Sequence, residues 1–145
     1  PGLVSIVALG LYTALTAAAF KLVPVTLTLS GIAGFILSIG IAVDANVLIF
    51  ERLKEELHEG KALVTALEES FKRAWSSIRD GHVTVLISCV VVYWISSSII
   101  RGFALTLAIG TLISLFTAVV STRTILRLLV ATRLSRFGWL FLQKK

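Results

Sequence analysis

The chain has 145 residues, of which 57% are apolar and only 15% charged, and its mean hydropathy is +0.94. Soluble domains have roughly 45–50% apolar and about 25% charged residues. The composition therefore excludes an ordinary soluble domain, and likewise a disordered, collagen-like or disulfide-rich secreted chain. It predicts an integral membrane protein, in which the net charge of +6 indicates basic cytoplasmic segments rather than nucleic-acid binding.

Long stretches without Asp, Glu, Lys or Arg divide the chain. A helix that crosses the hydrocarbon layer of about 30 Å needs roughly 20 mostly apolar residues. Four segments meet this requirement, and we expect membrane spans at about 3–20, 30–50, 83–100 and 103–122. The predicted fold class is all-α, a polytopic transmembrane bundle of four spans in a single domain, 1–145. Because the chain begins at Pro1 and contains no methionine, we expect it to be a piece of a longer protein.

Lysine and arginine are concentrated in two of the segments outside the predicted spans. Segment 51–80 and the tail 123–145 hold six each of the fourteen, and Lys21 and Arg101 are the other two. The two rich segments fall on the same side of a four-span chain, and such basic segments normally face the cytoplasm. We therefore expect 51–80 and both termini to be cytoplasmic.

The segments that join the spans carry helix signals of their own. Ser30 is expected to cap the second span, whose helix should continue to Leu57 and stop at Gly60. Between 61 and 79, apolar residues recur every three or four positions, which predicts an amphipathic helix. This helix either lies on the inner membrane surface or packs on the inner ends of its neighbours.

Asp44 is the only acidic residue inside the predicted spans, about two helical turns from the cytoplasmic end of the second span. A carboxylate in the bilayer costs a few kcal/mol on insertion scales, so such groups normally face a bundle interior, pair with another group or carry a proton. Two interpretations stay open. Asp44 is either a proton-carrying or cation-coupling group, or a hydrogen-bonded acid that ties helices together.

The second and fourth predicted spans each present a face of small residues at helical spacing. These residues are Gly34, Ser38, Ala42 and Ala45 in the second span, and Thr106, Gly110, Ser114, Thr117 and Ser121 in the fourth. Small residues let helices approach closely in lipid, so we expect the two parallel spans to pack along these faces, with Ser38 near Gly110. We expect Asp44 beside this seam, within reach of Thr117 or of water held there. The hydroxyl groups either serve packing alone or also hold water along a proton path.

The sequence gives little support for a metal site, a cofactor or an enzymatic activity. The single cysteine, Cys89, and two distant histidines cannot form a metal cluster, and no cofactor is expected. The chain has no nucleotide-binding Gly-Lys-Ser/Thr motif and no nucleophile–base set, which predicts that it is not an enzyme. His82 is expected to be a passive histidine at the membrane interface. Arg101 is expected to mark the outer boundary of the fourth span rather than to pair with Asp44.

Three runs of this sequence resemble the SecD/SecF family of the RND superfamily. They are 30–56, with the core Val-Asp-Ala-Asn-Val-Leu-Ile-Phe-Glu-Arg, then 71–80 and 100–110. The resemblance covers essentially the whole chain, but only the C-terminal membrane part of such a subunit. It implies that Asp44 is the proton-coupling residue. It also implies supporting polar or packing roles, which fall on Asn46, Gly40, Arg101, Thr106, Gly110, Ser114 and Thr117.

The resemblance implies a membrane subunit of the bacterial Sec machinery in the cytoplasmic (inner) membrane. With SecF, such a subunit uses the proton motive force to drive late steps of preprotein translocation through the SecYEG channel. YajC and YidC are further expected partners, together with the lipid bilayer, and nucleic acid is not one. The alternatives are a proton-coupled RND exporter of small molecules or lipids, and a non-conducting scaffold of the translocon. A titratable group within the spans favours a coupled motor over a scaffold.

Overall fold

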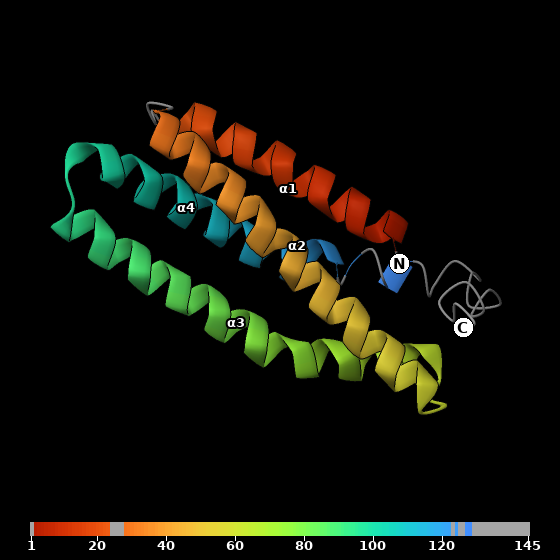
Figure 1. Cartoon of the computed structure of the whole chain (residues 1–145). Coiled ribbons are helices and arrows are strands. Elements are labelled where there is room, and N and C mark those ends of the chain that lie inside the picture. The colour runs from red at the N-terminus through yellow and green to blue at the C-terminus, as the bar shows by residue number, and fades with distance from the viewer. Residues whose placement is uncertain (1, 24–27, 123, 125–126, 129–145) are drawn as a thin grey trace.

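The computed structural model describes residues 2–23, 28–122, 124 and 127–128, and within these ranges it consists of helices and short turns. The helices are α1 (Gly2–Leu22), α2 (Leu29–His58), α3 (Leu63–Ile95), α4 (Ser98–Thr117) and a short π-helix, η1 (Ala118–Thr122) (Figure 1). Of these, α1 to α4 are long and apolar enough to cross a membrane. The predicted class, an all-α bundle of four spans, is confirmed.

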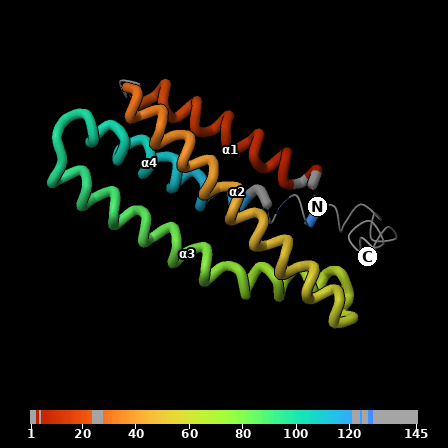
Figure 2. The backbone as a smooth tube through the Cα atoms, viewed as in Figure 1, coloured from red at the N-terminus to blue at the C-terminus, as the bar shows by residue number. Residues whose placement is uncertain are grey.

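The four long helices run alternately up and down, and the two ends of the bundle differ (Figure 1). The Gly60 end holds the α2–α3 turn and the start of α1, and the Ser96 end holds the α3–α4 turn. Helices α2 and α3 have 30 and 33 residues, against 21 and 20 in α1 and α4. At 1.5 Å per residue they are longer by roughly 14–20 Å. The α2–α3 hairpin therefore projects past its neighbours at the Gly60 end (Figure 2).

Helix α3 joins two elements that the sequence predicted separately. The amphipathic segment 61–79 and the third predicted span form one helix that ends at Ile95, and residues 98–100 already belong to α4. The buried positions Ala74, Ile78 and His82 follow one another at four-residue spacing, so both halves share one buried face. Gly81 does not break the helix, because a single glycine costs only about 1 kcal/mol there.

The half of the bundle nearer the Gly60 end has an apolar core. Ile49 and Leu53 of α2 pack there with Ala74 and Ile78 of α3 and with Ala118 of η1. Of the two interpretations of 61–79, packing against the neighbouring helices is therefore the one that the structure shows. The α2–α3 turn closes at Gly60, whose φ of 80° lies in the left-handed region that glycine adopts without strain. The predicted helix stop at Gly60 is confirmed.

A buried carboxylate ties the α2–α3 hairpin together. The Glu56 side chain is only 1% exposed, and Arg73 Nη1 donates to its Oε1 at 2.5 Å. Lys61 donates to the other oxygen of Glu56, and also to Glu69 at 2.5 Å. These hydrogen bonds, from Lys61 first and then Arg73, hold the pKa of Glu56 below its ordinary value.

We expect Glu56→Gln to lower the thermal stability of the protein at neutral pH, because it leaves Lys61 and Arg73 facing an uncharged amide. A lowered folded-state pKa stabilises the fold fully above the ordinary Glu pKa of 4.5, and this contribution is lost as pH falls through the lowered value. The melting temperatures of wild type and variant should therefore converge in acid. Circular dichroism melts across pH measure this. Glu55→Gln is the matched control, because the Arg52–Glu55 pair is 43% and 48% exposed.

At the Ser96 end, short polar contacts hold the starts of α2 and α4 together. The N-cap of α2 is Thr28, whose Oγ1 accepts from Gly31 N at 3.2 Å, so the prediction that Ser30 caps this helix is wrong. Ser30 instead donates to Ile99 O at 2.6 Å, in the first turn of α4. Arg101 Nε donates to Ser96 O at 3.1 Å, where α3 ends.

Candidate functional site

Helices α2 and α4 pack closely along the predicted small-residue faces. A Cβ atom on Gly34 would lie 2.4 Å from Thr106 Oγ1 and 2.6 Å from Phe103 O. A Cβ atom on Gly110 would lie 2.2 Å from Ser38 Oγ. Only glycine fits at these two positions, which lets the helix backbones approach as small residues do in lipid. The predicted packing of Ser38 against Gly110 is confirmed.

A hydroxyl pair adds α1 to this seam. Tyr12 Oη lies 2.6 Å from Ser38 Oγ, and Ser38 Oγ also donates to Phe35 O at 2.7 Å. Since a serine hydroxyl has a single hydrogen, Tyr12 is the donor to Ser38. Both side chains are fully buried. Three helices are thus joined at one depth, with Gly110 directly beside the hydroxyl pair.

His82 forms a second interior contact, between α3 and α4. The side chain is 3% exposed, with Nδ1 at 2.8 Å from Ile78 O and Nε2 at 3.0 Å from Ser114 Oγ. A carbonyl oxygen can only accept, so Nδ1 carries the hydrogen, and Nε2 of the neutral ring accepts from Ser114. The structure thus places His82 inside the bundle, where it joins α3 to α4. The four-residue spacing from Ala74 and Ile78 was the signal that could have placed His82 inside.

The α4 hydroxyls differ in what they bind. Thr106 donates to Gly102 O and Phe103 O of its own helix, at 3.0 and 3.1 Å, as expected of a side chain that serves packing. Thr117 is 2% exposed, and within the described part of the chain its Oγ1 is the one buried side-chain oxygen or nitrogen without a hydrogen-bond partner. A buried hydroxyl without a partner is costly, so Thr117 is a position where a water molecule would be stabilised.

Asp44 does not lie beside the seam. Its side chain is exposed, and no described residue forms a hydrogen bond or ion pair with its carboxylate. By the 100° step of a helix, Asp44 lies about 120° around α2 from Ser38. The buried face turns the other way, through Ala42 to Asn46, because each four-residue step adds about 40°. The expected contact between Asp44 and Thr117 is therefore not formed.

The surroundings of Asp44 are apolar. Val43 and Val47 on the same side of α2 are 37% and 50% exposed. Gly40, one turn away, is also exposed, and a Cβ atom there would meet nothing within 4 Å. A carboxylate among apolar side chains in a membrane normally faces protein or a water-filled cavity. The face of α2 that carries Gly40 and Asp44, the Asp44 face, thus has the character of a contact surface.

The structure divides the predicted site residues into three groups. Asn46, Thr106, Gly110, Ser114 and Thr117 are buried in the bundle interior. Gly40 and Asp44 lie on the outward side of α2, and Arg101 lies at the Ser96 end over the ring of Tyr93, 5.7 Å from its centroid. Within the described ranges, no three His, Cys, Asp or Glu side chains are placed to hold a metal ion.

Known proteins match this chain over nearly its whole length. The model of the MMPL family matches residues 2–145. This chain belongs to the MMPL family. Within it, the chain is 54% identical to the protein translocase subunit SecD of Thermobaculum terrenum over 97% of its own length. It is 58% identical to that of Synechocystis sp. over 90% of its length. The chain spans 28% of each of these relatives.

A solved structure shows the same fold in a relative of this MMPL-family chain. The crystal structure of SecDF, a translocon-associated membrane protein from Thermus thermophilus, is 40% identical and superposes with a TM-score of 0.87. The match covers 91% of this chain and 18% of the SecDF chain. The resemblance to the SecD/SecF family is thereby confirmed.

Proposed function

We propose that this chain is the C-terminal membrane part of a subunit of the bacterial Sec export machinery, and that Asp44 couples the proton motive force to late steps of preprotein translocation. The observation that carries the proposal is the Asp44 face. There the Asp44 carboxylate lies on an apolar, outward side of α2, one turn from Gly40, which has no side chain. The identity to SecD translocase subunits, 54% and 58% in two relatives, supports the link to export.

The Asp44 face is built to receive another helix. Gly40 allows close backbone approach one turn from the carboxylate, and the flanking valines supply an apolar rim. SecF is the partner that the family resemblance suggests for this face. Protonated, Asp44 is neutral and fits an apolar interface, whereas the ionised form needs water or a donor across it. Gain and loss of a proton would then change how the two parts pack.

A change in the packing of α2 would reach other helices through the α2–α4 seam. Because Gly34 and Gly110 bring α2 against α4, and Tyr12 ties α1 to Ser38, α2 cannot shift alone without breaking close contacts. Movement at Asp44 would therefore carry α1 and α4 with it. The energy available is about 2.3 kcal/mol per charge per 100 mV of membrane potential, together with the pH gradient.

Two alternatives differ in what they require of Asp44. A scaffold of the translocon would use Asp44 only as a hydrogen-bonding group and would not need it to gain and lose a proton. An RND exporter of small molecules or lipids would also use the proton, but would move a different substrate. Translocation of a preprotein into inverted vesicles, with ATP supplied and the proton gradient present or collapsed, separates them. The proposal requires that the full-length protein restores gradient-dependent export to vesicles that lack it.

The orientation of the chain gives a further prediction. We propose that the Gly60 end faces the cytoplasm, since six of the fourteen Lys and Arg residues lie in 51–80 and six more lie in 123–145, after the fourth span. Cysteines at Thr28 and Ser97 should react with a membrane-impermeant thiol reagent from outside, and a cysteine at Glu59 only from inside. A cysteine at Gln143, which lies outside the described residues, should likewise react only from inside. Cys89→Ala removes the one native thiol, which is buried, and the reverse labelling pattern would refute this orientation.

A further inference from the structure

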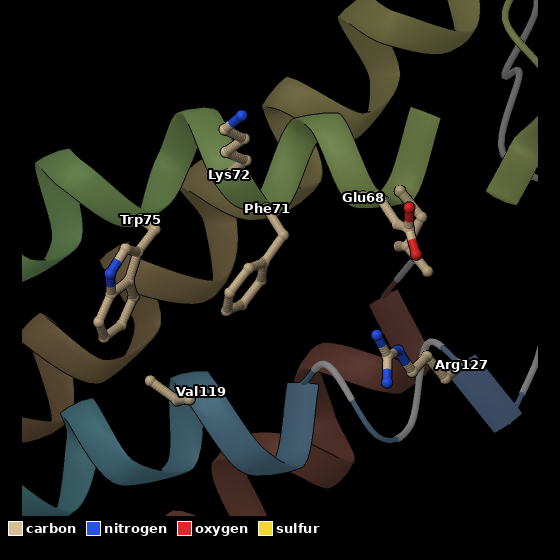
Figure 3. Close-up of a pocket in the computed structure, with 7 residues that line it drawn as sticks. Glu68, Phe71, Lys72, Trp75, Val119 and Arg127 are labelled. Carbon is tan, nitrogen blue, oxygen red and sulfur yellow. The ribbon is translucent and has the colours of Figure 1, made fainter. Parts of the chain in front are cut away.

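A pocket of about 480 Å³ lies near the Gly60 end, between α3, η1 and Arg127. None of its lining residues belongs to the α2–α4 seam or the Asp44 face. Its walls are apolar: Phe71 and Trp75 extend from α3 toward Val119 of η1 (Figure 3). The two rings are stacked, with centroids 6.1 Å apart and planes at 11°. Such a wall suits hydrocarbon rather than a small soluble ion.

A cationic side chain, Arg127, faces this pocket. The Arg127 guanidinium group points into the opening below α3, and Glu68 is the one acidic residue of the lining (Figure 3). Lys72 also contributes to the lining, but its ammonium group points away from the opening (Figure 3). Segment 123–145, which starts directly after η1, holds six Lys and Arg residues and no acid. Arg127 therefore belongs to a strongly basic segment of the chain.

The pocket also lies where the apolar part of the chain gives way to the charged part. Val119 belongs to 102–122, which has no Asp, Glu, Lys or Arg, and Arg127 follows just beyond it. In membrane proteins this level corresponds to the lipid headgroups, where tryptophan and arginine are enriched. Basic pockets at this depth between helices bind anionic lipid headgroups.

We infer that this pocket binds one anionic phospholipid, with its phosphate on Arg127 and the upper part of its acyl chains along Phe71, Trp75 and Val119. The site is separate from Asp44, and it would bind lipid in the same way if the proposed role in export were wrong.

Quenching of Trp75 fluorescence tests the inference. In the full-length protein, every tryptophan except Trp75 is replaced by Phe, including Trp94 and Trp139, and the protein is reconstituted with brominated phosphatidylglycerol or brominated phosphatidylcholine. We expect Trp75 to favour phosphatidylglycerol about fivefold, and Arg127→Gln to remove most of this preference, since one basic residue near an anionic surface contributes about that factor. Arg79→Gln, an equal loss of charge on α3 outside the pocket, should leave the preference intact.

Equal quenching by the two lipids would overturn the inference, as would a preference that survives Arg127→Gln. A third result would identify the tail of the chain as the occupant instead. In that case Trp75 would resist quenching by either lipid until residues 129–145 were deleted. Circular dichroism of each variant confirms that the helices are intact, so that a lost preference reports lipid binding rather than unfolding.

Discussion

Asp44→Asn in the full-length protein is expected to abolish the stimulation of preprotein export by the proton motive force while the protein still inserts and folds. The side chain is exposed on α2 and forms no hydrogen bond or ion pair with any described residue. An amide of the same shape therefore removes no contact inside the bundle. It does remove the only acid in the spans that could gain and lose a proton. Translocation into inverted vesicles, with and without a proton gradient, measures the effect.

Asp80→Asn is the matched control for this experiment. Asp80 is 67% exposed and pairs only with its neighbour Arg79 in the described structure, so its amide variant should export normally. Asp44→Glu keeps a titratable group and should retain part of the gradient-dependent export. Near-normal gradient dependence in Asp44→Asn would refute the coupling role. In that event the scaffold would become the better account of the chain.

Gly110→Ala is expected to destabilise the bundle by about 1–3 kcal/mol, the usual cost of overpacking a close-packed interior. The added methyl group would lie 2.2 Å from Ser38 Oγ and 2.4 Å from Ser38 Cβ, so α2 and α4 would have to separate. Gly10→Ala is the matched control, because a Cβ atom at Gly10 meets nothing within 4 Å. That change should be neutral or stabilising by up to about 1 kcal/mol, since alanine favours helices. Unfolding of the purified protein in mixed micelles measures both.

A second substitution tests whether the clash itself is the cause. Ser38→Gly removes the two atoms that the new methyl group would meet, so the double variant Gly110→Ala with Ser38→Gly should lose less stability than the two single variants added together. Ser38→Gly alone should be destabilising, because Tyr12 loses its hydrogen-bond partner. Strictly additive losses in the double variant would show that the two residues are not in contact, against the packing described above.

The sequence predicted the spans and the small-residue seam well, because both depend on local pattern. Charge-free stretches of about 20 residues define helices that can cross a bilayer. Small residues at four-residue spacing define a face, and the parallel direction of α2 and α4 brings Ser38 to the depth of Gly110. These inferences need only helix geometry and the order of the spans.

The sequence could not predict the contacts between residues that lie far apart in the chain. Arg73 reaches Glu56 across the α2–α3 turn, and His82 reaches Ser114 between two helices. No spacing rule connects such residues before the helices are placed. The position of Asp44 was misjudged for another reason. The buried face of α2 shifts around the helix toward Asn46, so a residue close to the seam in sequence ends on the outward side.

Proton movement through the assembled complex is the most direct test of the coupling role of Asp44. The full-length protein and its partners, reconstituted in vesicles with a pH-sensitive dye inside, would be given a proton gradient and a preprotein to export. We expect proton flow down the gradient to accelerate during export with the wild type and to stay at the background rate with Asp44→Asn. Equal proton flow with both proteins, at equal levels of insertion, would contradict the coupling role of Asp44.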